Sequence, residues 1–156
     1  MKAVVRSVLL AFVAVSLVYL IVDEVRGRSA PAVRKTPSDE GGGLQIYVYY
    51  FHGNKRCATC RSIEAYAREA IEAGFAEELK SGLMEWRTVN VDEPGGGRYV
   101  DMFKLTTRAV VLEEMRGDTQ VRWKNLDRVW GLVKDKPAFV TYVQQETRAF
   151  LKAGEK

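Results

Sequence analysis

The chain has 156 residues, of which 47% are hydrophobic and 28% are charged, as is typical of one globular domain with a short addition. The net charge is only +4, and the basic residues are interleaved with acidic ones instead of forming one stripe, so nucleic acid is not expected as a partner. Both cysteines fall in one Cys-x-x-Cys motif, Cys57 to Cys60. A bridge across so short a loop stabilises little, so a purely structural disulfide is a poor explanation for the pair.

Residues 3–22 are apolar apart from Arg6, Ser7 and Ser16, and as a helix they are long enough to cross a hydrocarbon core. Charged residues begin at Asp23 and no small-x-small site follows closely, which favours an uncleaved anchor over a cleaved export signal. We expect residues 1–22 to be a single-pass transmembrane anchor or signal-anchor. The very short basic N-terminus resembles a Sec-type signal-anchor and places the soluble domain on the periplasmic or extracytoplasmic side, although basic residues behind the span outnumber those before it.

Residues 23–43 are rich in Arg, Lys, Pro, Ser and Glu, carry no hydrophobic period and end in three glycines. This composition is typical of a flexible linker. The linker separates the anchor from one soluble domain, expected at residues 44–153.

The soluble domain begins with a nearly continuous apolar run, residues 44–51, which predicts a strand buried on both faces. Period and turn signals then predict the following elements: a helix at 60–75, a strand at 83–91, a short helix at 99–105, a strand at 109–115, a turn at 117–118, a strand at 119–123, a short helix ending at 133 with Asn125 or Asp127 as its cap, and a last helix from Pro137 to about Lys152.

The predicted order is β, α, β, α, β, β, α. A parallel strand pair joined by a helix and followed by a hairpin predicts an α/β fold with a mixed central sheet and helices on both faces. The glycines at 95–97 lack the lysine of a phosphate-binding loop and open no long helix, so they are interpreted as an ordinary loop.

The cysteine motif lies where the first strand gives way to a helix. The N-terminus of a helix favours negative charge, and the neighbours Lys55, Arg56 and Arg61 add positive charge, so the thiolate of Cys57 is favoured. Cys57 is the candidate attacking sulfur. Cys60 lies one turn further on, is expected to be more enclosed, and is the candidate resolving sulfur.

With these features the domain resembles the thioredoxin-like superfamily over about residues 44–151. The resemblance depends on Tyr47 to Phe51, on the motif Cys57-Ala58-Thr59-Cys60, on Asn90-Val91-Asp92 and on the turn at Gly117-Asp118. Residues 50–60 and 123–127 are similar to the nitrophenyl-compound nitroreductase subunit, ArsF-type family. That resemblance implies a thioredoxin-like fold and a role in reducing nitroaromatic compounds or aromatic arsenicals beside a partner reductase subunit and a permease.

Two features depart from ordinary thioredoxins. The resemblance implies a buried carboxylate before the motif, where this chain has Tyr49-Tyr50-Phe51, and a cis-proline before the third strand, where it has Thr106 to Ala109. Three residues are therefore candidate auxiliary groups: His52 as a proton relay, and Thr107 and Arg108 as neighbours of the sulfurs, with Arg108 stabilising thiolate. A merely exposed histidine and a solvent-facing arginine are the competing interpretations.

The leading hypothesis is a membrane-anchored thiol-disulfide oxidoreductase or electron-transfer subunit with a protein redox partner. It needs no cofactor beyond the Cys57-Cys60 disulfide, because the sequence has no flavin or nicotinamide fingerprint. The alternative is capture of a thiophilic ion such as Cu(I) or As(III) by Cys57 and Cys60, with His52 as a third ligand. A tethered scaffold with incidental thiols is the third interpretation, and a closed zinc site lacks ligands.

Overall fold

The structure is a computed structural model that describes residues 43–154. The anchor expected in residues 1–22, and the linker apart from Gly43, lie outside the described residues. Within residues 43–154 no helix is long and apolar enough to span a membrane.

The described part of the chain forms four strands and five helices. In chain order they are β1 (Leu44–His52), α2 (Ala58–Gly74), α3 (Ala76–Ser81), β2 (Met84–Asn90), α4 (Gly97–Met102), β3 (Ala109–Arg116), β4 (Thr119–Asn125), α5 (Val129–Leu132) and α6 (Lys136–Gly154).

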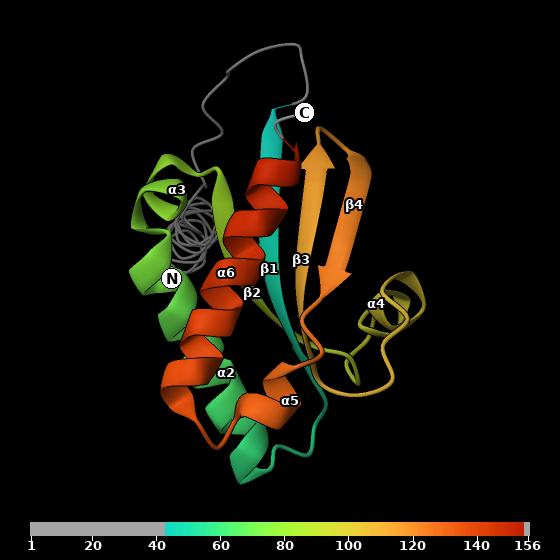
Figure 1. The fold of residues 1–156 in the computed structure, drawn as a ribbon. Helices are drawn as coiled ribbons and strands as arrows, with labels where there is room; N and C mark the ends of the chain where they lie inside the picture. The colour runs from blue at the N-terminus through green and yellow to red at the C-terminus, as the bar shows by residue number, and fades with distance from the viewer. Residues whose placement is uncertain (1–42, 155–156) are drawn as a thin grey trace, which may run out of the picture. The chain divides into compact units, whose positions relative to one another are not determined.

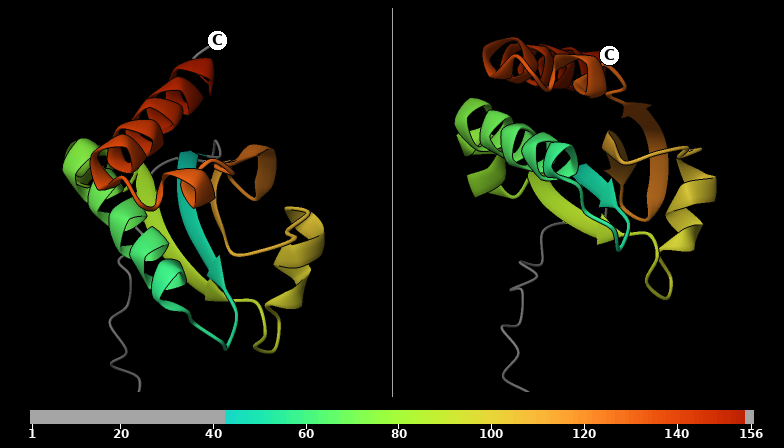
Figure 2. Two further views of the ribbon diagram at one scale, coloured as in Figure 1. Left: turned by 60° about the horizontal axis from the view of Figure 1, so that its bottom comes forward. Right: turned by 90° about the horizontal axis from the view of Figure 1, so that it is seen from below.

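The strands form one mixed sheet in the order β2-β1-β3-β4. β1 and β2 are parallel, whereas β3 pairs antiparallel with both β1 and β4. Figures 1 and 2 show α2 and α6 on one face of the sheet and α4 on the other. The predicted α/β class, with a mixed central sheet between helices, is confirmed.

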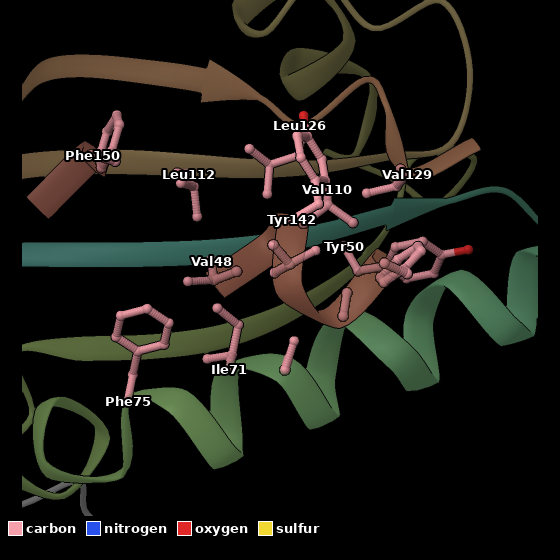
Figure 3. Packing of buried hydrophobic residues seen from close by; sticks show 14 of the residues in the cluster. Val48, Tyr50, Ile71, Phe75, Val110, Leu112, Leu126, Val129, Tyr142 and Phe150 are labelled. Atoms are coloured by element: carbon pink, nitrogen blue, oxygen red, sulfur yellow. The ribbon is translucent and has the colours of Figure 1, made fainter. Parts of the chain in front are cut away.

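Both faces of β1 are buried, as its continuous apolar run predicts. Val48 and Tyr50 contribute to the larger core, which lies between the sheet and the helices α2 and α6 (Figure 3). Tyr49 and Phe51 point to the opposite face and join Phe103, just after α4, in a second, aromatic core. Burying each such side chain contributes about 1.5 to 3 kcal/mol relative to leaving it exposed.

A buried ion pair joins the hairpin to the end of α6. Glu114 on β3 is 1% exposed, and its carboxylate accepts a hydrogen bond of 2.6 Å from the guanidinium of Arg122 on β4. Arg122 also donates to the carbonyl oxygen of Phe150 and lies over the ring of that residue. The pair therefore links three elements that are far apart in the chain.

Helix boundaries show the clearest differences from the sequence prediction. The chain leaves α2 at Phe75 and immediately forms α3, a short helix that was not expected. The prediction that Asn125 or Asp127 caps α5 is wrong, because β4 continues to Asn125 and the residue before α5 is Arg128, which makes no side-chain cap. α6 is instead capped by Asp135, whose carboxylate accepts from the backbone N–H of Ala138 at 3.0 Å.

Candidate functional site

The cysteine motif occupies the first turn of α2, directly after β1 and a four-residue loop. Cys57 is the N-cap, with an extended backbone (φ −75°, ψ 167°), and its sulfur accepts a hydrogen bond of 3.1 Å from the backbone N–H of Cys60. An N-cap side chain normally satisfies such an N–H with oxygen. Here sulfur takes that position, which places it at the positive end of the helix dipole.

Cys57 and Cys60 form a disulfide with their Cα atoms 5.1 Å apart, inside the usual range. The two residues differ sharply in accessibility, because Cys57 is exposed whereas Cys60 is 3% exposed. The expectation that Cys60 is the more enclosed of the pair is confirmed. A molecule arriving from solvent meets Cys57 first.

Tyr50 holds the buried side of the motif in place. Its hydroxyl donates a hydrogen bond of 2.6 Å to the carbonyl oxygen of Cys60, and the residue is fully buried. Burial raises the pKa of the Tyr50 phenol above its ordinary value, an effect that the charges of Arg56 and Arg108 partly oppose. The phenol therefore keeps its proton and remains a donor. This role of Tyr50 was not predicted from the sequence, although the alternation of side chains along β1 directs Tyr50 toward α2.

The basic residues around Cys57 are less available to stabilise its thiolate than their sequence positions suggest. Arg56 forms an ion pair with Glu64, in the second turn of α2, and Arg61 donates to the carbonyl oxygen of Arg56 at 3.0 Å. From its sequence position alone, Arg56 is expected to favour the Cys57 thiolate through its positive charge. The helix brings Glu64 back over the loop, so much of that charge is offset.

His52 is half-buried at the end of β1. Its Nδ1 lies 3.0 Å from the carbonyl oxygen of Gly53. A carbonyl only accepts, so this contact assigns a proton to Nδ1 and leaves Nε2 of the neutral ring with its lone pair. The ring also stacks on Tyr50, with 6.0 Å between the ring centres.

Arg108 lies against the loop that carries the motif, and does not simply point into solvent. Its Nη2 donates to the carbonyl oxygen of Lys55 at 3.0 Å, and its own carbonyl oxygen accepts from the indole N–H of Trp130 at 2.9 Å. Nε of Arg108 is buried without a hydrogen-bond partner. Thr107, beside it, is exposed.

Side-chain amides and carboxylates join the loop after β1 to the end of β2. Asp92 accepts from the backbone N–H of Asn54 at 2.7 Å, and the amide of Asn90 donates to the side chain of Asn54 at 2.8 Å. A Cβ at Gly53 would lie 2.6 Å from the Asp92 carboxylate, so a larger residue there would displace this carboxylate from the N–H of Asn54. The motif loop is thereby held at the carboxyl ends of the two parallel strands.

A cavity of about 210 Å³ opens at this edge, between the end of β1 and the segment before β3. It brings together all three candidate auxiliary groups, His52, Thr107 and Arg108. The two cysteines are not among the residues that line it. In residues 43–154 no cluster of three or more His, Cys, Asp or Glu side chains is arranged to hold a metal ion.

Comparisons with known proteins add little to this geometry. No protein-family model matches the chain, and no curated protein matches it. A solved structure described as "Structure of a malarial protein" is similar at 13% identity and a TM-score of 0.35, covering 59% of this chain and 97% of that one. A likeness at this level establishes neither a family nor a function.

Proposed function

We propose that residues 44–153 form a thioredoxin-like thiol-disulfide oxidoreductase whose working group is the Cys57-Cys60 pair. The observation that carries the proposal is the unequal placement of the two sulfurs at one helix N-terminus, with Cys57 exposed and Cys60 buried. Thiol-disulfide exchange needs this asymmetry, because one sulfur must reach the partner and the other must reach only the first.

In the reduced protein, the Cys57 thiolate attacks one sulfur of a partner disulfide and expels the other sulfur as a thiolate. The thiolate of Cys60 then attacks Cys57, releases the partner's second sulfur and forms the Cys57-Cys60 disulfide. Two electrons pass to the partner disulfide, which becomes a dithiol. The reverse sequence oxidises a partner dithiol.

The neighbouring groups support these steps chemically. The positive end of α2 favours the Cys57 thiolate, and Arg108, held on the Lys55 carbonyl, adds positive charge on the same side. His52 is half-buried at the end of β1, with Nδ1 3.0 Å from the carbonyl oxygen of Gly53, and we propose it as the group that takes up and returns the thiol proton. Thr107 is the exposed residue that a docked partner would meet beside Arg108.

We further propose that the chain acts as a single-pass membrane protein anchored through residues 3–22, with the domain on the extracytoplasmic or periplasmic side, where disulfide chemistry is favoured. The partner is a redox protein. Following the ArsF-type resemblance, the chain would serve a nitroaromatic or arsenical reductase system with a permease, and a separate subunit would carry the flavin because dithiols alone reduce nitro groups poorly. Retention in the membrane after alkaline carbonate washing tests the anchor; release would contradict it.

The exchange mechanism is tested by replacing each cysteine separately in the full-length protein. Cys57→Ser should abolish exchange, whereas Cys60→Ser should accumulate mixed disulfides with partners, visible on non-reducing gels and released by dithiothreitol. The two variants are matched controls for each other.

A thiophilic metal site predicts a different pattern. Both thiolates would then be equal ligands, and either substitution would lower the affinity for Cu(I) or As(III) to a similar extent. Equal losses of metal binding together with no trapped partner in Cys60→Ser would refute the exchange proposal.

A further inference from the structure

The cavity at the carboxyl ends of β1 and β2 has the volume of a small-molecule site. In open α/β sheets, ligands bind outside the carboxyl ends of the strands. A cavity of about 150 Å³ already accepts benzene, so about 210 Å³ accommodates one ring, or an aliphatic group of similar size, with a polar substituent.

The residues that line the cavity are of two chemical kinds. Phe51, Val91, Val100 and Leu105 are apolar, whereas residues 106–108 carry two hydroxyls and a guanidinium. A ligand that matches both kinds has an apolar body and one strongly polar group.

Residues 106–108 carry hydrogen-bond donors that the described part of the chain leaves unused. The backbone N–H groups of Thr106, Thr107 and Arg108 form no hydrogen bond with residues 43–154, whereas the N–H of the preceding Leu105 is bound to Val100. The Arg108 guanidinium donates one hydrogen bond, to the carbonyl oxygen of Lys55. Consecutive N–H groups beside a guanidinium are a donor set suited to an anion.

Asp92 limits how much negative charge the cavity accepts. Asp92 also lines the cavity, and one oxygen of its carboxylate accepts a hydrogen bond from the backbone N–H of Asn54 beside Gly53. Its negative charge disfavours a second negative charge on a bound ligand.

We propose that this cavity binds a small organic monoanion, a carboxylate at residues 106–108 with an apolar body against Phe51, Val91, Val100 and Leu105. The two sulfurs do not line this cavity, whereas His52, Thr107 and Arg108, the groups proposed to assist exchange, do. Binding needs no thiol, so it is measurable in the oxidised protein whether or not the exchange proposal holds.

The test is calorimetric titration of oxidised full-length protein in detergent micelles, with a micelle blank, using benzoate, its neutral isostere benzamide, and the dianion phthalate. In the calorimeter, benzoate should bind saturably with one site per chain. In an NMR spectrum of the same protein, it should shift the backbone amide resonances of residues 106–108. Benzamide and phthalate should each bind at least about tenfold more weakly, since a hydrogen bond to a charged group is worth about an order of magnitude or more in affinity.

Arg108→Gln should weaken benzoate binding by about tenfold or more. Arg68→Gln removes an exposed arginine paired with Glu72 on α2 and should leave binding unchanged. No saturable benzoate binding, equal binding of benzamide, or unchanged affinity in folded Arg108→Gln would each overturn the proposal. If Arg108→Gln does not fold, the amide shifts of the wild-type chain decide, and shifts confined to other residues would overturn it.

Discussion

The hydrogen bond between Tyr50 and Cys60 leads to a prediction about the stability of the domain. Tyr50→Phe keeps the ring in the core between β1 and α2 and removes only the hydroxyl that donates to the Cys60 carbonyl at 2.6 Å. The substitution leaves no large cavity, so the measured change reports the hydrogen bond itself.

The expected loss is about 1 to 1.5 kcal/mol of unfolding free energy. A buried hydrogen bond contributes about 1 kcal/mol net, and leaving a buried acceptor unsatisfied costs about 1 to 3 kcal/mol. The lower part of that range applies because the Cys60 carbonyl lies inside α2, where the helical N–H four residues on also bonds to it. For a domain of this size the loss corresponds to a fall in Tm of about 4 to 6 °C.

Urea unfolding of the oxidised full-length protein in detergent micelles, followed by tryptophan fluorescence, measures this loss. Tyr66→Phe is the matched control, because Tyr66 is a partly buried residue of α2 whose ring packs edge-on against Phe139. The control should stay within about 0.3 kcal/mol of wild type. Equal stabilities of the two variants would refute the claim that Tyr50 holds the motif.

Three further predictions concern the scaffold. Glu114→Gln should cost about 2 to 3 kcal/mol in urea unfolding, because it leaves the partly buried Arg122 without its charge partner; a loss below about 0.5 kcal/mol would show the pair to be unimportant. Gly96→Ala should cost about 2 kcal/mol, because its Cβ would lie 2.4 Å from a backbone carbonyl oxygen at the end of β2, whereas Gly97→Ala, with nothing within 4 Å, should be close to neutral. Burial, and to a smaller extent the neighbouring Glu113, raises the pKa of Tyr49 above its ordinary value. The contribution of Tyr49 to the unfolding free energy is therefore complete below the unfolded tyrosine pKa of about 10, and it declines as the pH rises toward the pKa of the folded state. Unfolding free energies measured from pH 8 to 11 should therefore fall less steeply in Tyr49→Phe, and identical slopes would contradict this assignment.

Local sequence signals were sufficient for most of the architecture. The aromatic run before the motif could only be a strand with both faces buried, and the period of Ile63, Ala67 and Ile71 required a helix after it. The position of Pro137 marked the first turn of the last helix. These features depend on side chains within a few residues of each other, so they can be predicted from the sequence alone.

The sequence also located the dithiol and its asymmetry. A cysteine at a helix N-cap is exposed by geometry, and a cysteine three residues on turns toward the sheet. Both positions follow from the strand-to-helix junction at residues 52–58 and from the 3.6-residue period.

Only the tertiary structure decided what surrounds the dithiol. Glu64, in the second turn of α2, offsets much of the charge of Arg56. Tyr50 donates to the carbonyl oxygen of Cys60, and Arg108 donates to that of Lys55, 53 positions away in the chain. The cavity likewise draws its walls from four separate segments. Such contacts are set by the register of β3 on β1 and by the packing of α4 on the sheet, and no local pattern specifies either, because the partners are chosen by the shape of the whole core.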